Sequence, residues 1–405
     1  MVIWYISKYA TPQKYFFGTR HFYLAEEWIK TGNDVIIFTS NSNHLTDRLP
    51  VFKGKSLFED INKIKTYWLN TYKVKKGNSS SLKRILTWFH FEWQFFTLNK
   101  KNISKPDVII VSSLSLLTVL NGYWFSKKYK CKFIFEVRDI WPLSLIELGG
   151  FTKWNPFILF LFWIEKLGYK KANAIVGTMP NLQEHVDHII GKNNKCYTIP
   201  QGFSENFYNN QKFLDNDYIQ KYLPKDAFIV AYAGTISANN PIDVLINAAE
   251  LLKNEAIYFV IIGDGNKKEF LIKKSKNLSK VIFAPSLPKN KVNHFLSFVS
   301  VCFDSFDSNL AKYGLSRNKW IDYMYAGKPI ICSYSGFESM INESNSGSFV
   351  AFNNSQLLAD EILKYYKMDK TALTEMGKNA HKYIIENRSF KKLASDYIKI
   401  INSNV

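Results

Sequence analysis

At 405 residues the chain is too long for one ordinary hydrophobic core, so we expect two domains. Hydrophobic residues make up 46% and charged residues 21% of the chain, which excludes a largely disordered protein. The 53 basic and 34 acidic side chains give a formal charge of +19, which favours anionic partners. No zinc-finger spacing or aromatic ribonucleoprotein motif accompanies this charge, so nucleic acid is less favoured than anionic lipid or a phosphate-rich substrate.

The cysteines and the apolar runs indicate a cytoplasmic protein. The four cysteines lack any Cys-x-x-Cys spacing, which favours reduced thiols. The N-terminus enters a strand pattern without a basic and apolar leader, and no apolar stretch reaches the roughly 18 residues that span a bilayer. Two aromatic runs, 88–96 and 155–164, are either buried helices or interfacial helices at the inner face of the cytoplasmic membrane.

In the first half of the chain, β-branched and aromatic runs alternate with helical patterns, as in parallel sheets built from βαβ units. A helix is predicted from Thr19 to Lys30. Gly18 at its start would let backbone N–H groups approach a phosphate, and Arg20 adds a cation, although an ordinary helix cap explains this spacing equally well. The predicted strands are Val2–Ser7, Val35–Thr39, Asp107–Ser112, Lys132–Val137 and Ala174–Thr178.

A polar stretch after residue 203 marks a domain boundary. We expect a Rossmann-like domain over 1–203 that binds the acceptor, a second over 204–385 that binds a nucleotide-sugar, and a C-terminal helix in 386–405 that crosses back to the first. Ligands of such doubly wound sheets bind where the strand C-termini meet a cleft. The second set of predicted strands is Phe228–Ala233, Tyr258–Ile262, Val281–Ala284, Val299–Phe303 and Ile330–Ser333.

Two loops that follow these strands are candidates for holding a nucleotide. Gly234 and Thr235 stand between a strand and a helix, which is the order of a phosphate site, although the second and third glycines of a dinucleotide fingerprint are missing. Gly263, Asp264 and Gly265 follow the next strand, and their glycines would allow tight backbone near a base or ribose. A plain turn is the alternative for this second loop.

The strongest signal follows the fourth strand of the second half. Ser316 is a predicted N-cap, and a helix that starts there would point its free N–H groups, with Arg317, Asn318 and Lys319, toward an anion. Asp322 comes three residues after Lys319, so both can border one side of the cleft. Its carboxylate could accept both ribose hydroxyls. A capped helix with solvated charges is the alternative.

Together these motifs resemble glycosyltransferase family 4, in particular the bacterial surface-polysaccharide branch similar to N-acetyl-fucosamine transferases. The resemblance spans nearly the whole chain. It is carried by 232–235, 262–265 and 318–330 in the second half, and by 18–20, 137–142 and 199–202 in the first.

The resemblance implies a GT-B fold, which is α/β with two Rossmann-like parallel sheets, and a UDP-sugar donor. It also implies retention of configuration and no required metal. The Gly18 and Gly234 loops would flank the diphosphate, the loop from Ser316 to Lys319 would bind it, and Asp322 would hold the ribose. Arg138 and Asp139 would lie near the donor sugar as catalytic residues, together with Lys319.

The acceptor implied by the charge and the aromatic runs is a polyprenyl-diphosphate-linked saccharide, because that lipid is anionic and held at the membrane. The product would be O-antigen, capsule or a related surface polysaccharide, and the transferred sugar an N-acetylated hexosamine or deoxyhexosamine. The sequence does not reveal which sugar moves or which linkage forms.

The chain departs from the family pattern at a few positions. Gly314 replaces the first glutamate of the Glu-x7-Glu motif, and Thr235 and Asn240 replace two cations, so Lys319, Arg317 or Arg20 would take over their role. Two other functions stay open: a UDP-sugar 2-epimerase of the same fold, and an inactive membrane-associated scaffold. Neither the Asp215–Asp217 triplet nor the His185 and His188 pair has the context of a metal site.

Overall fold

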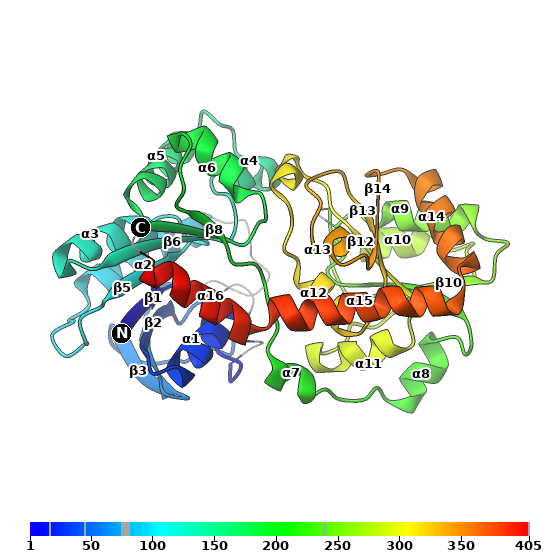
Figure 1. The fold of residues 1–405 in the computed structure, drawn as a ribbon, viewed down its shortest axis with the longest axis horizontal. Helices are drawn as coiled ribbons and strands as arrows, with labels where there is room; N and C mark the ends of the chain where they lie inside the picture. Colours follow the sequence, from blue (N-terminus) through cyan, green and yellow to red (C-terminus); the bar gives the residue numbers. More distant parts are fainter. Residues whose placement is uncertain (16–17, 44–45, 74–81, 239, 404–405) are drawn as a thin grey trace. The chain divides into compact units, whose positions relative to one another are not determined.

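The computed structural model describes residues 1–405 except 16–17, 44–45, 74–81, 239 and 404–405. It contains two compact units, one formed by residues 1–200 with 390–405 and one formed by residues 201–389. Each unit holds one β-sheet with helices around it (Figure 1). The two-sheet α/β architecture predicted from the sequence is confirmed.

The sheet of the first unit has eight strands in the order β3-β4-β2-β1-β5-β6-β7-β8, and every neighbouring pair except β3 with β4 is parallel. Helices cover both of its faces, because alternate residues of the central strands pack on α1 and α16 on one side and on α2 and α3 on the other. The strands are β1 Val2–Ile6, β2 Asp34–Ser40, β3 Ser56–Ile61, β4 Ile64–Leu69, β5 Val108–Ser112, β6 Lys132–Val137, β7 Ala174–Gly177 and β8 Cys196–Thr198. The helices are α1 Arg20–Lys30, α2 Leu82–Thr97, α3 Thr118–Tyr129, α4 Leu143–Gly149, α5 Pro156–Lys171, α6 Leu182–Ile190 and α16 Phe390–Asn402.

The last helix, α16, belongs to the first unit because its apolar side chains recur at helical spacing on one face. That face packs on α1: Trp28 donates its indole N–H to the Ala394 carbonyl at 3.1 Å, and the Tyr23 and Phe390 rings stack with centroids 5.0 Å apart. Helix α16 therefore completes the core that contains β1 and α1.

The sheet of the second unit is fully parallel, with strand order β11-β10-β9-β12-β13-β14. Its strands are β9 Phe228–Ala233, β10 Ile257–Ile262, β11 Val281–Ala284, β12 Val301–Ser305, β13 Ile330–Ser333 and β14 Gly347–Val350. Its helices are α7 Glu205–Asn209, α8 Asn216–Tyr222, α9 Asp243–Leu251, α10 Lys268–Lys274, η1 Lys289–Lys291, α11 Val292–Ser297, η2 Asn309–Tyr313, α12 Asn318–Tyr325, α13 Met340–Glu343, α14 Ser355–Lys367 and α15 Lys370–Arg388.

The structure also differs from the predicted elements. The β3–β4 hairpin was not predicted; its two-residue turn, Asn62 and Lys63, has positive φ at both positions, as hairpin turns require. The strand predicted to end at Phe303 continues as β12 to Ser305, which brings Asp304 into the sheet.

Candidate functional site

The candidate site lies at the carboxyl edge of the second unit's sheet, where the loops after β9, β10 and β12 meet the start of α12. These strands are neighbours in the sheet, so parallel pairing brings their C-termini together. This edge is where open α/β sheets bind ligands.

Two of the predicted loops pack against each other through their main chains. The Gly234 N–H donates to the Ile262 carbonyl at 3.0 Å, and the Ile236 N–H donates to the Asp264 carbonyl at 2.9 Å. A Cβ at position 263 would lie 1.8 Å from the Gly234 oxygen, and one at 265 would lie 2.0 Å from the Ile236 oxygen. Only glycine fits at these two positions, whose φ values of +143° and +154° also favour it. These two glycines thus allow the main chain of the Gly234 loop to pack directly against them.

A buried carboxylate, Asp304, organises the basic residues of the site. Lys319 donates to its Oδ1 at 3.0 Å and also to the Tyr232 hydroxyl at 2.9 Å. The Arg317 Nε lies 3.2 Å from its Oδ2, and the Trp320 indole N–H donates to the same oxygen at 2.8 Å. One carboxylate thus fixes two cations, and the cluster keeps one formal positive charge.

The two cations lie beside the Gly234 loop. A Cβ at position 234 would lie 3.1 Å from the Lys319 Nζ, so the missing side chain leaves room for the ammonium group under the loop. The side chains of Lys319 and Arg317 are 13% and 15% exposed, whereas Asp304 is fully enclosed. Burial lowers the pKa of Lys319 to about 8, although Asp304 opposes the shift. The site therefore offers an incompletely compensated cation near an exposed glycine loop.

The start of α12 differs from the prediction. The helix begins at Asn318 with Arg317 as its N-cap residue, so the expectation that Ser316 caps it is wrong. The Ser316 hydroxyl instead accepts a hydrogen bond from the Gln201 N–H at 2.8 Å, because the segment from 201 onward passes beside it. Asn318 is exposed at the first helical position.

Asp322 has partners other than those of Lys319. Its two carboxylate oxygens accept hydrogen bonds from the Tyr208 hydroxyl and from the Lys289 ammonium, whereas Lys319 donates to Asp304. That Asp322 and Lys319 border one side of the cleft stays a prediction. The ribose role of Asp322 stays a prediction, and a ribose would have to compete with these partners.

Thr235 and Asp264 form the tips of the two glycine loops, and both are exposed. The Asp264 carboxylate accepts a hydrogen bond from the Gly265 N–H at 2.9 Å, which leaves its second oxygen for a hydroxyl or a base. Their binding roles also stay predictions.

Arg20, in the first unit, is a structural residue. Its guanidinium lies 3.1 Å from Glu136 Oε1 and donates to the carbonyls of Pro200 at 2.9 Å and Ile199 at 3.1 Å. With its side chain 1% exposed, it does not offer a free cation, which corrects the expectation that it replaces a lost phosphate ligand. Gly18 lies against the ring of Tyr23, where a Cβ would approach ring atoms to 2.7 Å. Two residues of its loop, Phe16 and Phe17, lie outside the described residues.

Arg138 and Asp139 follow β6 at the carboxyl edge of the first sheet. The Arg138 N–H donates to the Ser113 hydroxyl at 2.9 Å, and that hydroxyl donates to the Asp139 carbonyl at 3.3 Å. Asp139 is exposed as a residue, but the protein packed around its carboxyl raises the pKa of that group, while the positive charges of Arg138 and Arg84 oppose the shift. Asp139 is therefore open to a polar ligand.

Sequence reasoning missed Asp304 and Tyr232, which hold Lys319 in place. Asp304 gave a signal, because a carboxylate directly after an apolar strand run marks the ligand edge of a parallel sheet, but the predicted strand stopped one residue short of it. Tyr232 belongs to the 232–235 segment that carries the resemblance, but its contact with Lys319 was not predicted, since an aromatic residue inside a strand is ordinary core.

Within the described ranges, no three His, Cys, Asp or Glu side chains cluster as metal ligands do. The described part of the chain also lacks a helix long and apolar enough to cross a membrane. The expectation that the reaction needs no metal stays a prediction.

Residues 215–383, which include Asp304, Lys319 and both glycine loops, match the family model described as Glycosyl transferases group 1. The chain is a glycosyltransferase. No curated protein matches the transferase. Its GT-B fold is shared with sucrose-phosphate synthase from Thermosynechococcus elongatus, at 16% identity and a TM-score of 0.73 with 98% of each chain covered.

Two further solved structures share the fold of the transferase. One is HepE of Anabaena in complex with UDP-glucose, at 13% identity and a TM-score of 0.63 with 98% of each chain covered. The other is WaaG, a glycosyltransferase involved in lipopolysaccharide biosynthesis, at 13% identity and a TM-score of 0.64, covering 99% of this chain and 100% of that one.

Proposed function

We propose that this transferase moves a sugar from a UDP-sugar to a lipid-linked saccharide with retention of configuration, in the synthesis of O-antigen, capsule or a related surface polysaccharide. The sugar is an N-acetylated hexosamine or deoxyhexosamine, as the resemblance to the N-acetyl-fucosamine transferase branch of family 4 implies. The observation that carries the donor proposal is the Lys319 ammonium, held by Asp304 beneath the Gly234 loop. HepE, which has the same fold, was crystallised with UDP-glucose, and WaaG acts in lipopolysaccharide synthesis.

The chemistry suits this arrangement. When the bond between the anomeric carbon and the diphosphate oxygen breaks, negative charge grows on the leaving UDP. Lys319 and Arg317 lie where they can stabilise it, and Asp304 fixes both cations before the reaction. The acceptor hydroxyl forms the new bond on the same face and gives its proton to a phosphate oxygen. Asp139, with Arg138, is proposed to orient the donor sugar.

Mass analysis of products from a panel of UDP-sugars, each with and without a polyprenyl-diphosphate-linked saccharide, tests this proposal. We expect one glycosylated product, and UDP release that depends on the acceptor. Acceptor-independent conversion of the UDP-sugar would support the epimerase instead, and an absence of turnover with every pair would support the scaffold.

A lipid-linked acceptor requires the enzyme to reach a membrane, and one surface of the first unit suits this. We call it the aromatic surface; its large exposed side chains are Leu86, Phe89, Trp93 and Phe96 on α2, Trp124 on α3, and Trp154, Leu159, Phe160 and Trp163 on or just before α5. Ring contacts join the three helices, since the ring centroids of Phe89 and Phe157 lie 6.2 Å apart and those of Phe96 and Trp124 lie 5.1 Å apart.

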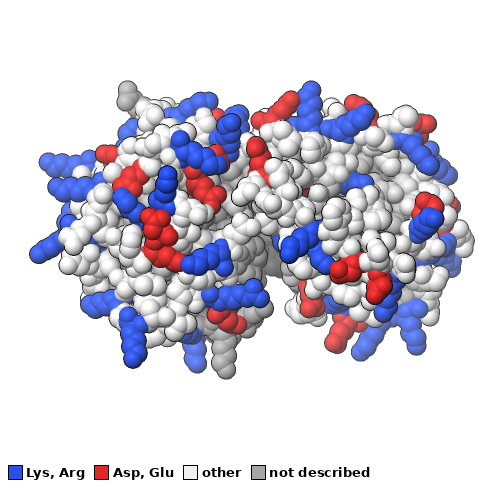
Figure 2. Space-filling model, turned by 90° about the horizontal axis from the view of Figure 1, so that it is seen from below, with Lys and Arg blue, Asp and Glu red and all other residues white. Residues whose placement is uncertain are grey.

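Lysines lie over these rings: the Lys128 ammonium is 5.0 Å from the ring centroid of Trp124, and the Lys153 ammonium is 5.2 Å from that of Trp154. Aromatic side chains bordered by lysines are typical of proteins that bind the interface of anionic membranes. On the face drawn in Figure 2, by contrast, lysines and arginines are scattered among acidic residues rather than gathered in a stripe.

The triple variant Trp93→Ser/Phe160→Ser/Trp163→Ser tests the aromatic surface. We expect it to lose most sedimentation with vesicles of anionic phospholipid, whereas Phe213→Ser/Phe270→Ser/Phe298→Ser, which removes three exposed rings from the second unit, should sediment like the wild type. Equal sedimentation of the two variants would contradict membrane docking through this surface.

A further inference from the structure

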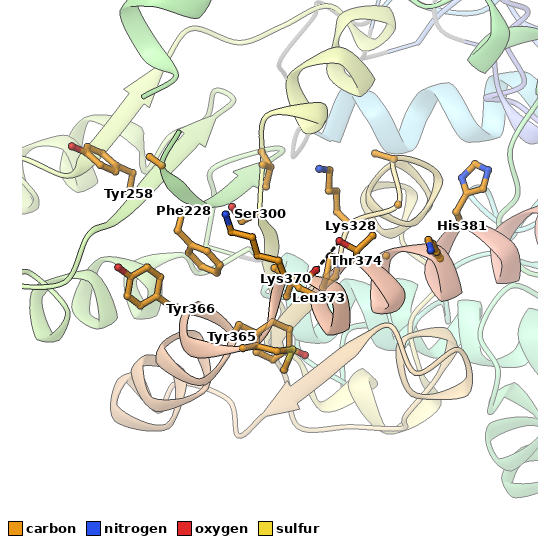
Figure 3. A pocket seen from close by; sticks show the side chains of 18 of the residues that line it. Phe228, Tyr258, Ser300, Lys328, Tyr365, Tyr366, Lys370, Leu373, Thr374 and His381 are labelled. Atoms are coloured by element: carbon orange, nitrogen blue, oxygen red, sulfur yellow. Dashed lines mark hydrogen bonds between the residues drawn. The ribbon is translucent and has the colours of Figure 1, made fainter. Parts of the chain in front are cut away.

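A cavity of about 1270 Å³ lies at the amino edge of the second unit's sheet, the edge opposite the Gly234 loop. Phe228 at the start of β9, Tyr258 near the start of β10, and Ser300 and Pro329 just before β12 and β13 line one side of it. Helix α15 forms the other side (Figure 3). A nucleotide bound at the carboxyl edge would leave this cavity free.

The wall formed by α15 is set by main-chain contact. Gly377 in this helix lies against Gly327, which follows α12, and a Cβ at position 377 would lie 2.1 Å from the Gly327 oxygen. Beside this contact, the His381 Nδ1 donates to the Tyr325 carbonyl at 2.6 Å. Both contacts fix the position of α15, so the cavity is part of the packed fold.

The lining of the cavity is strongly basic. Five lysines contribute to it, and Asp226 is the one acidic residue among those that line it. Of these five lysines, only Lys378 has a carboxylate partner within 4.0 Å among the described residues; its ammonium lies 3.6 Å from Glu375. The other four lysines are Lys225, Lys328, Lys370 and Lys382.

Lys328 is the most enclosed of these cations. It is half-buried, and its ammonium donates to a neutral group, the Ser297 carbonyl, at 3.2 Å. Burial lowers its pKa, as expected for a cation whose charge is poorly compensated. An anion in the cavity would supply the missing charge.

The cavity also offers flat apolar surface. The rings of Phe228 and Tyr366 meet edge to face with centroids 5.3 Å apart, and Tyr258 lines the same end. Figure 3 shows Lys370 extending from α15 toward Ser300, with these three rings to one side and Lys328 to the other. Anion-binding and ring-binding groups therefore line one space.

We propose that this cavity binds a phosphorylated small molecule that carries a planar ring. Its phosphates would contact Lys328 and Lys370, and its ring would lie against Phe228 and Tyr258. This ligand is distinct from the donor, because the donor loops lie at the other edge of the sheet.

Calorimetric titration of the full chain, saturated with UDP, tests the proposal with two probes, ATP and inorganic tripolyphosphate. We expect both probes to bind, and ATP to bind more tightly because it carries a ring. Lys328→Ala/Lys370→Ala should weaken both at least about tenfold, whereas Tyr258→Ala should remove only the advantage of ATP. The matched control, Lys364→Ala/Lys367→Ala, removes two lysines of α14 outside the cavity and should change neither affinity.

Failure to detect either probe on the UDP-saturated protein would overturn the proposal, and so would equal losses in the two lysine pairs. If the protein does not bind UDP at all, titration of Lys319→Ala with the same two probes in the absence of UDP separates the two proposals. Probe binding that survives Lys319→Ala and is lost in Lys328→Ala/Lys370→Ala supports the cavity independently of the donor site.

Discussion

Each unit of the transferase has a buried carboxylate that pairs with an arginine at the start of a helix, yet the two pairs differ in their surroundings. In the first unit Glu136 on β6 pairs with Arg20, the first residue of α1, and both side chains are almost fully enclosed. In the second unit Asp304 on β12 pairs with Arg317, the N-cap residue of α12, and with Lys319.

The two pairs differ in what lies next to the cations. Arg20 donates to the carbonyls of Ile199 and Pro200, so its charge is used within the protein. Lys319 lies beneath Gly234, whose missing side chain leaves room for the ammonium group directly under the loop proposed to hold the donor. The surroundings thus distinguish a basic residue whose charge is used within the protein, Arg20, from Lys319, which we propose contacts the donor.

The largest effect is expected on folding, in the first unit. Glu136→Ala should lower the free energy of unfolding by about 3–5 kcal/mol, because it leaves the Arg20 charge buried without a counter-ion. Urea unfolding followed by tryptophan fluorescence measures this. Glu27→Ala removes a surface partner of Lys30 and should cost under about 0.5 kcal/mol. A loss below about 1 kcal/mol in Glu136→Ala would contradict the claim that the Arg20 pair stabilises the first unit.

The next effect is expected on ligand binding, in the second unit. Lys319→Ala should weaken UDP binding by about 2 kcal/mol, roughly 30-fold, because a charge-assisted contact to the diphosphate is lost. Calorimetric titration with UDP measures it. Arg20→Lys, which retains a buried cation in the first unit, should leave UDP affinity within about twofold of the wild type. Similar losses in both variants would mean that the two cations do not differ as proposed.

The smallest effect is expected from pH. Because burial lowers the pKa of Lys319 to about 8, this side chain is a cation at pH 7 and mostly neutral at pH 9. UDP affinity should therefore fall as pH rises, by about tenfold between these values if only the cation binds. Calorimetric titrations with UDP across this pH range measure the fall in affinity. Lys319→Arg should abolish this fall, because arginine stays charged. The same fall in Lys319→Arg would assign the titration to another group.

The sequence predicted the central strands of both sheets, because these are short runs of β-branched and aromatic residues, but it did not predict the edge strands β8 and β14. It did not predict the β3–β4 hairpin or the extension of β12 to Asp304, since strand pairing brings in residues that are polar locally. The roles of Arg20 and Lys319 also looked alike in sequence. Burial and partners separate them, and both depend on residues more than 80 positions away, such as Glu136 for Arg20 and Tyr232 for Lys319. The donor roles of the remaining site residues stay predictions.

Gly263 and Gly265 have a consequence for how donor preference can change in this protein. Because main-chain atoms of the neighbouring loop occupy the space of their side chains, the backbone of β9 and β10 fixes the spacing between the two loops. The exposed tips, Thr235 and Asp264, are not under this constraint. Under the proposed donor role of these loops, substitutions at the tips are expected to alter which chemical groups are recognised while the loop spacing stays the same, so selection for new donors is best directed there.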